Sequence, residues 1–287
     1  MLPGIGYPVC EMCPLCHVPG SYDMPVNRPG FDVSVPHPAR VWDYWLGGKD
    51  NFAADREVAA DILRVMPVMA EIARGCRLFL AAAVSYLAAE AGIRQFLDIG
   101  TGLPTANNTR ELAQRAVPEA RIVYVDNDPI VLSHAEALLR SGPHGMCAYV
   151  DADARDPRTV LAGAEKILDF SQPIAVIMLG ILHYIPDDDD PYAVVRTYLD
   201  AVCPGSYLVA SHASSDIEMA GQLEATDRYN SQANIPLTLR SEEQFAGFFR
   251  AMDLVPPGIT PLGQWTPGAS GTGRATLPTY TAVARKP

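Results

Sequence analysis

The sequence predicts a doubly wound α/β fold, in which a mostly parallel sheet carries helices on both faces. Two observations lead to this prediction. Short apolar runs of β-forming residues recur along the chain, and their nearly continuous hydrophobicity is typical of strands covered on both faces. Helix signals follow the runs, so strand and helix alternate as they do in parallel sheets. The runs are residues 95–99, 122–125, 147–150, 174–179 and 207–210.

The helices after the strands begin with local capping signals. An Asp carboxylate can accept hydrogen bonds from the unpaired amides of a first turn, and Pro at the first helical position lacks the N–H that would stay unpaired. The helix after the first strand opens instead with Asn108-x-x-Glu111, a capping-box pattern. Asp-Pro pairs start the other three, at Asp128-Pro129, Asp156-Pro157 and Asp190-Pro191.

A helical region precedes the sheet. Phe79, Ala83 and Leu87 recur at helical spacing and form one apolar face, and residues 41–90 are predicted to be helical. We therefore expect residues 32–92 to form an N-terminal helical cap region.

The sheet domain is expected to span residues 93–287. Its tail predicts a helix at about 241–252, followed by strand-like segments that end at 279–284. Two such strands can pair as an antiparallel edge of the sheet.

A Pro- and Cys-rich leader occupies residues 1–31. It contains the pattern Cys10-x-x-Cys13-x-x-Cys16-His17. Three thiolates and an imidazole can complete a zinc site, and Cys13-x-x-Cys16-His17 also matches the c-type haem attachment pattern. Adjacent Cys16 and His17 seldom reach one metal together, and haem attachment requires export. We therefore expect a disordered leader and no bound metal.

Composition limits the partners. The 287 residues include 22 Lys+Arg and 33 Asp+Glu, a formal net charge of −11, and 48% of them are hydrophobic. This acidic chain has no basic cluster of the kind that binds nucleic acid or an anionic membrane. No apolar segment typical of a secretory signal follows Met1, and no apolar run reaches the length of a membrane helix. We expect a cytoplasmic protein with a small-molecule partner.

The loop after the first predicted strand, Asp98-Ile-Gly100-Thr101-Gly102, is suited to ligand binding. Glycines let the backbone approach a ligand, and the following helix presents free amides. The dinucleotide pattern G-x-G-x-x-G fails, because Thr105 stands at the third glycine. Asp98 would repel a phosphate and attract a cationic group.

Polar residues also follow the next strands. Asp126, beside Asn127, can accept hydrogen bonds from both hydroxyls of a ribose. Asp153 can accept from an adenine amino group while the Ala154 amide donates to a ring nitrogen. Carboxyl ends of parallel strands meet at one edge, which is where ligands bind in doubly wound sheets.

These motifs resemble those of class I S-adenosylmethionine (SAM)-dependent methyltransferases, and more narrowly an actinobacterial family long known as DUF574. The resemblance covers about Asp32 to Pro287. It implies a seven-stranded, Rossmann-like sheet with an antiparallel last strand and a SAM cofactor. The segments that carry it are PARVWDYWLGGKDNF (38–52), LDIGTGLPT (97–105), YVDNDP (124–129) and HYIPD (183–187).

Carried onto this chain, the resemblance implies a set of cofactor residues. The glycines of the first loop border the methionine portion, and the fourth strand's end lines the wall beside the sulfonium. Where relatives tend to have Asn-Arg, this chain has Cys76-Arg77, so the Asn contact is lost while Arg77 can still pair with the SAM carboxylate. The expected set is Arg77, Asp98, Gly100, Thr101, Gly102, Asp126, Asn127, Asp153, Ala154, Leu179 and Gly180.

The predicted function is methyl transfer from SAM to the oxygen or nitrogen of a small molecule. His183 and Tyr184, after the fourth strand, are the candidate catalytic residues because a base can act there. The alternatives are a catalytically silent SAM-binding protein and a nicotinamide-dependent oxidoreductase. The loop Lys49, Asp50, Asn51 and Phe52 either folds over the cofactor, as a lid or substrate contact, or is a helix–helix turn.

Overall fold

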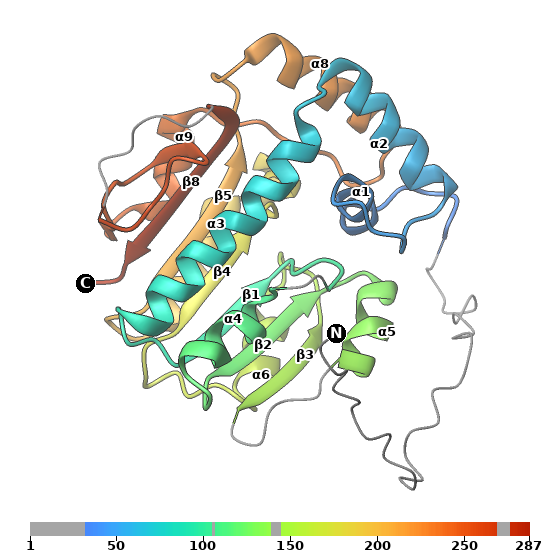
Figure 1. Cartoon of the computed structure of the whole chain (residues 1–287). Helices are drawn as coiled ribbons and strands as arrows, with labels where there is room; N and C mark the ends of the chain where they lie inside the picture. The colour runs from blue at the N-terminus through green and yellow to red at the C-terminus, as the bar shows by residue number, and fades with distance from the viewer. Residues whose placement is uncertain (1–31, 105–106, 139–144, 269–275) are drawn as a thin grey trace, which may run out of the picture. The chain divides into compact units, whose positions relative to one another are not determined.

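Seven strands form the main path of a central sheet, in the order β3-β2-β1-β4-β5-β8-β6 (Figure 1). The computed structural model describes residues 32–104, 107–138, 145–268 and 276–287. Neighbouring strands from β1 to β5 are parallel, and β8 is antiparallel to β5. The predicted mostly parallel sheet with an antiparallel last strand is confirmed. An additional strand among the described residues, β7 (Thr260–Leu262), pairs with β8 beside this path. The other bounds are β1 Gln95–Ile99, β2 Arg121–Asp126, β3 Met146–Asp151, β4 Ala175–Leu179, β5 Tyr207–Ala213, β6 Asp253–Leu254 and β8 Leu277–Arg285.

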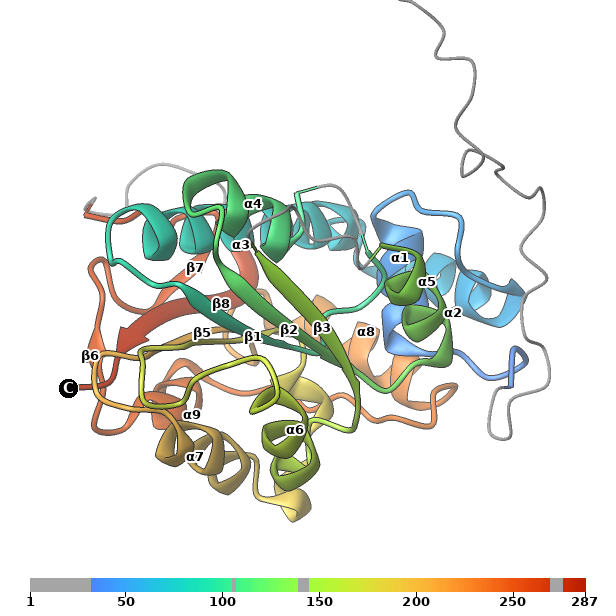
Figure 2. The same cartoon turned by 90° about the horizontal axis from the view of Figure 1, so that it is seen from below.

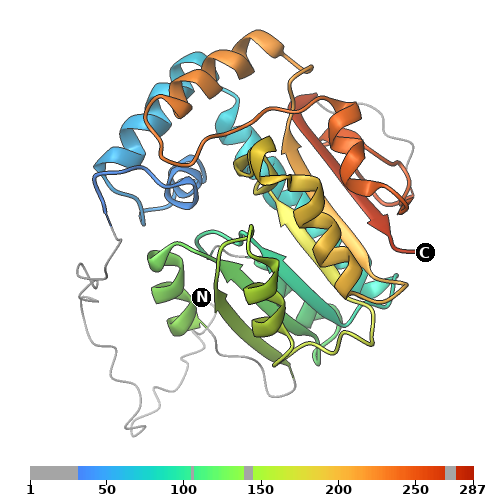
Figure 3. The same ribbon diagram turned by 180° about the vertical axis from the view of Figure 1, so that it is seen from behind.

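Helices cover both faces of this sheet, as Figure 2 shows in a view along it. On one face lie α3 (Met69–Ala89) and α4 (Thr109–Ala116). The opposite face, seen from behind in Figure 3, carries α6 (Pro157–Ala164), α7 (Pro191–Ala201) and α9 (Glu242–Ala246). Beside β3 lies α5 (Pro129–Leu138). Beyond the carboxyl ends of the central strands lie α1 (Pro38–Trp45), α2 (Ala53–Val65) and α8 (Met219–Asn230).

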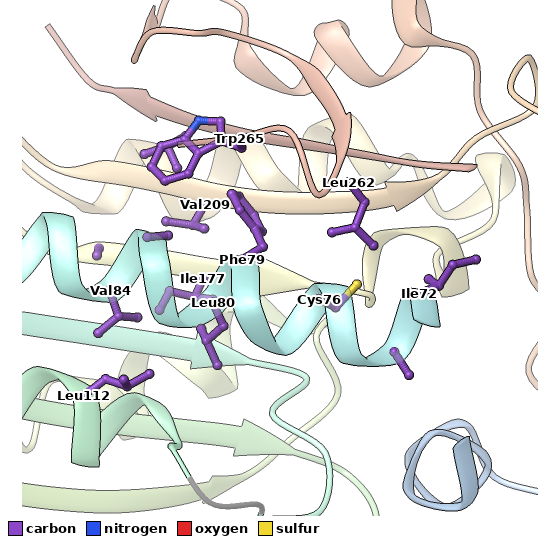
Figure 4. Packing of buried hydrophobic residues seen from close by; sticks show 14 of the residues in the cluster. Ile72, Cys76, Phe79, Leu80, Val84, Leu112, Ile177, Val209, Leu262 and Trp265 are labelled. Carbon is purple, nitrogen blue, oxygen red and sulfur yellow. The ribbon is translucent and has the colours of Figure 1, made fainter. Parts of the chain in front are cut away.

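The core consists of two apolar layers, because successive strand residues point to opposite faces. In β1, Phe96 joins the layer under α3, whereas Leu97 joins the layer under α7 and α9. Figure 4 shows the first layer, in which side chains of α3 face the sheet and the loop that carries Trp265. The Phe79 and Trp265 rings meet edge to face at 5.3 Å.

The helix starts that the sequence predicts are confirmed. The Asn108 side chain accepts from the Glu111 amide at 3.0 Å, and Asp190 accepts from Ala193 at 3.0 Å. Asp156 caps α6 through the Thr159 amide at 3.2 Å. These caps fix the first turn of each helix after the loop that follows the preceding strand.

The region predicted to be helical, residues 41–90, consists of three helices, α1, α2 and α3. A Cβ on Gly48 would lie 1.9 Å from the Asp43 carboxylate, so the chain turns there on a glycine. Pro67 follows Met66, which has left the helical region, and ends α2. The helix expected at 241–252 ends at Ala246 and continues as a 3₁₀ turn, Gly247–Phe249.

The long apolar helix α3 belongs to the core. It is long and apolar enough to cross a membrane, but half of that stretch is buried within the fold, where it packs on the sheet. Within residues 32–92, only α1 and α2 therefore lie beyond the strand ends. The leader, including Cys10, Cys13, Cys16 and His17, lies outside the described residues.

Candidate functional site

A pocket opens at the carboxyl ends of β1 to β4, between the strand-end loops and the helices α1 and α3. It encloses about 1290 Å³, part of which is open to solvent. Residues predicted from separate strand ends line this one pocket together. They are Arg77, Asp98, Gly100, Thr101, Gly102, Asp126, Asn127, Asp153, Ala154, Leu179 and Gly180.

The loop after β1 brings backbone to the pocket surface. Gly100 and Gly102 have φ values of 71° and 65°, in the left-handed region that favours glycine. A Cβ on Gly100 would lie 2.8 Å from the Ile181 side chain, whereas one on Gly102 would meet nothing within 4 Å. Because Gly102 lines the pocket, a side chain there would take space from a ligand.

Asp98 is a buried carboxylate at the end of β1. The Thr109 hydroxyl donates to its Oδ2 at 2.5 Å. Burial raises the pKa of Asp98 to about 6, against the opposing effects of this hydrogen bond and of Arg77. The Arg77 guanidinium comes from α3 and donates to the Asn107 carbonyl oxygen at 3.2 Å. A carboxylate and a guanidinium therefore lie at the same end of the pocket.

Asp126, at the end of β2, is held by backbone amides. Its Oδ2 accepts from Gly102 at 2.7 Å, and its Oδ1 accepts from Asn127 at 2.9 Å and Asp128 at 3.0 Å. Burial raises the pKa of Asp126. A carboxylate can accept about four hydrogen bonds, so one position on Oδ2 is left for a ligand hydroxyl.

Asp153, after β3, is occupied by a neighbour that the sequence analysis missed. The Arg155 guanidinium donates to both Asp153 oxygens, at 3.0 and 2.7 Å, and the Arg155 amide and the Asn127 side chain donate as well. The guanidinium also reaches Asp189 at 3.1 Å. The acceptor capacity of Asp153 is thus used within the protein, and Arg155 itself lines the pocket.

The far wall of the pocket is formed after β4. The Gly180 amide donates to the Ser211 hydroxyl oxygen at 3.0 Å, and a Cβ on Gly180 would lie 3.6 Å from the Trp42 ring. Trp42 donates from its indole N–H to the Tyr184 hydroxyl at 3.3 Å. Burial raises the pKa of Cys76, on α3, to about 12, so this thiol is neutral and poorly nucleophilic.

The two candidate catalytic residues differ in their access to this pocket, since Tyr184 lines both the pocket and an adjoining cavity, whereas His183 lines only the latter. The His183 side chain is 3% exposed, and its ring packs against Tyr184 and His212. Burial, aided by the charge of nearby Arg240, holds the pKa of His183 well below its usual value, and burial raises that of Tyr184 to about 12.

The segment Lys49, Asp50, Asn51 and Phe52 does not line the pocket. It forms the turn between α1 and α2, which was one of the two interpretations of this motif. Asp43 holds the turn by accepting from the Asp50 amide at 2.9 Å and the Asn51 side chain at 2.8 Å. Asp43 itself lines the pocket, and burial raises its pKa. The sequence motif contained Asp43, but no pattern marked it as a pocket residue.

His37 and Arg40 connect α1 to Asp128, which follows β2, and to Asp55 of α2. His37 Nδ1 lies 2.9 Å from Asp128 Oδ2, and the His37 amide donates to Asp55 at 2.9 Å. The Arg40 guanidinium lies 3.4 Å from Asp128 and 3.6 Å from Asp55. Burial alone would raise the pKa of Asp128, but His37 and Arg40 lower it below its usual value. Asp128 was predicted only as a helix start, and it also positions the pocket's α1 wall.

No cluster of three His, Cys, Asp or Glu side chains that could hold a metal ion occurs in the part of the chain that the structure describes.

Comparisons with known proteins identify the family. Residues 25–287 match the S-adenosyl methyltransferase family. A DUF574 family protein from Streptomyces avermitilis MA-4680 is 41% identical, with a TM-score of 0.85, over 89% of this chain and 99% of its own. A candidate methyltransferase from Thermobifida fusca YX is 38% identical, with a TM-score of 0.81, over 90% and 97%.

More distant structures share the fold alone. The mitomycin 7-O-methyltransferase MmcR is 16% identical, with a TM-score of 0.50, over 89% of this chain and 74% of its own. None of the curated proteins matches the chain. The long matches to the profile and to the two closely similar structures show that the chain belongs to the S-adenosyl methyltransferase family, whose cofactor is SAM.

Proposed function

We propose that the chain transfers the methyl group of SAM to an oxygen or nitrogen of a small organic molecule, with SAM in the pocket at the strand ends. The observation that carries the proposal is the convergence of all eleven expected cofactor residues on that pocket, from α3 and four separate strand ends. The donor set fits SAM. Buried carboxylates suit its ammonium and hydroxyl groups, and a guanidinium suits its carboxylate.

The methionine portion lies along the loop after β1. Gly100 and Gly102 let the backbone approach it, Asp98 accepts from its ammonium, and Arg77 pairs with its carboxylate. The free position on Asp126 Oδ2 accepts from one ribose hydroxyl, which is a narrower role than the contact with both hydroxyls that the sequence suggested.

The adenine lies near Ala154, whose carbonyl oxygen accepts from the buried Tyr198 hydroxyl at 2.8 Å. We assign the base recognition to the backbone of Ala154, because Asp153 is already saturated by Arg155 and Asn127. Asp153 then acts by positioning the Arg155 guanidinium at the pocket wall. Leu179 and Gly180 line the side nearest the sulfonium.

SAM supplies a methyl group that its positive sulfur already activates for in-line displacement. The protein's own contribution is to hold the nucleophile close and aligned, and to exclude water with apolar walls. His183 and Tyr184 are poorly suited to be general bases. The lowered pKa of His183 makes its ring a weak base, and the raised pKa of Tyr184 keeps its hydroxyl protonated. We assign both as hydrogen-bonding groups that orient the acceptor.

Calorimetric titration with S-adenosylhomocysteine, the demethylated product, tests the cofactor site. Gly102→Ala places a methyl group in the pocket and is expected to weaken binding at least tenfold. Gly47→Ala is the matched control, because Gly47 has a similar φ of 80° and open space around it but lies outside the pocket. Equal affinities of the two variants, or tighter binding of NAD than of the product, would contradict this site.

Turnover is tested separately with SAM carrying a radiolabelled methyl group. Label transferred to any member of a library of phenols and amines supports an enzyme. Tight binding of the cofactor without transfer to any of them would favour the catalytically silent alternative, for which the replacement of Asn by Cys76 is the motivating observation.

A further inference from the structure

A second cavity adjoins the cofactor pocket on the other side of Gly180. Its walls come from the helical elements α1, α2, α3 and α8, from the ends of β5 and β8, and from the loop after β4. The two cavities share four lining residues, Trp42, Cys76, Gly180 and Tyr184. Because Gly180 has no side chain, nothing at that position separates them. A molecule in the second cavity would therefore lie next to the wall assigned to the sulfonium.

The second cavity is uncharged. No Asp, Glu, Lys or Arg is among the described residues that line it. Aromatic rings form two of its walls. The rings of Trp42 and Trp45 of α1 meet edge to face with their centroids 5.6 Å apart, and the ring centroids of Tyr184 and Tyr229 of α8 lie 5.9 Å apart. Moving an ion without a partner from water into such surroundings costs on the order of several kcal/mol of solvation free energy. The walls favour a neutral molecule with a flat apolar body.

Two polar side chains that line this cavity, His183 and Tyr229, have buried atoms without a hydrogen-bond partner among the described residues, and His183 has two such atoms. His183 is 3% exposed, and neither of its ring nitrogens has a hydrogen-bond partner among the described residues. The neighbouring His212 is fully engaged, through the Ala213 carbonyl oxygen at 2.8 Å and Arg240 at 2.9 Å. An unpaired buried polar group costs about 1–3 kcal/mol, and a ligand hydroxyl would remove that cost. His183 therefore marks where the polar atom of a ligand belongs.

We propose that the second cavity binds the methyl acceptor, and that this acceptor is an uncharged aromatic molecule whose ring hydroxyl bonds to His183. The inference rests on the proposed function and names its substrate class. In the transfer, a lone pair of the hydroxyl oxygen forms the new O–CH₃ bond while the S–CH₃ bond breaks and leaves its electrons on sulfur. The resulting oxonium is a strong acid and loses the hydroxyl proton to water at the solvent-open side of the cofactor pocket, while the neutral His183 ring keeps the oxygen aligned.

Binding of two probes to the protein saturated with S-adenosylhomocysteine tests this proposal. The probes are 2-naphthol and 2-naphthoate, which share a ring system and differ in charge at pH 7.5. Binding is measured by quenching of tryptophan fluorescence and by calorimetry. We expect 2-naphthol to bind at least ten times more tightly than 2-naphthoate, since only the carboxylate must lose its hydration.

Variants on α8 and at His183 locate the binding. Ala225 is buried and lines the cavity, whereas Ala220 is exposed on the same helix. Ala225→Met is expected to weaken 2-naphthol binding at least tenfold, and the matched Ala220→Met to leave it unchanged. His183→Gln is expected to reduce the preference for 2-naphthol over naphthalene, while His134→Gln, at a half-buried position outside the cavity, leaves that preference unchanged.

The outcomes separate this inference from the cofactor proposal. If S-adenosylhomocysteine fails to bind the wild-type protein, the cofactor proposal falls. If it binds but 2-naphthol shows no binding at its solubility limit, binds no better than 2-naphthoate, or responds equally to Ala225→Met and Ala220→Met, the acceptor cavity is refuted. Bound cofactor product in every variant rules out unfolding as the cause.

Discussion

Binding of the cofactor is expected to depend on pH through Asp98. Burial raises the pKa of this carboxyl from 3.8 to about 6. On the proposed assignment, only the ionised form attracts the ammonium of S-adenosylhomocysteine. Affinity should therefore be nearly constant above pH 7 and should fall as the pH drops through 6.

The size of this effect follows from the shift. The pKa difference of about 2 units corresponds to about 3 kcal/mol between the protonation states, and Asp98 is only 7% exposed, so solvent screens it little. Because its folded-state pKa is raised, the native protein holds more protons than the unfolded chain between about pH 4 and 6. Unligated stability should thus decrease as pH rises across that window. Ligand affinity changes the opposite way, by about tenfold between pH 7 and pH 5.

Calorimetry at half-unit steps from pH 5 to pH 7.5 measures this dependence, and circular dichroism at each pH confirms that the protein stays folded. Asp98→Asn is neutral throughout, so its affinity should be independent of pH and close to that of the wild type at pH 5. His37→Gln is the matched control, since His37 also lines the pocket but contacts Asp128 and not Asp98, so the pH dependence should persist in this variant. A flat wild-type profile, or a slope that persists in Asp98→Asn, would refute the role assigned to Asp98.

Two buried charge clusters give further predictions. Arg240 is 1% exposed and donates to the Leu182 and Ile185 carbonyl oxygens and to Asp187, so Arg240→Met should lower the free energy of unfolding in urea by about 3 kcal/mol. Asp187→Asn should cost under about 1 kcal/mol because the Asp187 side chain is 67% exposed, and equal losses would contradict this account. Asp128→Asn should lower the free energy of unfolding by about 2 kcal/mol and shift tryptophan emission to the red as α1 loosens. The difference in stability from the wild type should vanish as the pH falls through the lowered pKa of Asp128. Unchanged stability at pH 7 would show that the pairing of His37 with Asp128 does not hold α1.

The fold was largely predictable because its signals are local. Each buried strand is a continuous apolar run. Several of the following helices are capped by a side chain that accepts from an amide three residues further along the chain, as at Asn108 and Asp190. The loop after β1 was identifiable for the same reason. The backbone at Gly102 is left-handed, a conformation that favours glycine, so the residue type itself indicates the local turn.

The parts that could not be predicted depend on tertiary contacts. Helix α8 begins after Glu218 without a side-chain cap, and its amphipathic pattern is weak: Leu223 is exposed while the polar Gln222 is buried. It is held by packing against α2, which no local pattern encodes. The ion pair between Asp153 and Arg155 could have been predicted from the sequence, because the two residues are only two positions apart and of opposite charge.

The two cavities imply a separation of roles on the proposed assignments. All the cofactor residues but Arg77 of α3 stand at strand ends that the sheet holds in register, whereas the acceptor cavity is walled mainly by helices α1, α3 and α8. Substitutions on the inner face of α8, as at Ala225, should change which acceptor binds without changing cofactor affinity. Among the described residues, Trp42, Cys76, Gly180 and Tyr184 line both cavities. Among them Cys76 carries a thiol that burial keeps neutral, so it does not compete with the acceptor for the methyl group.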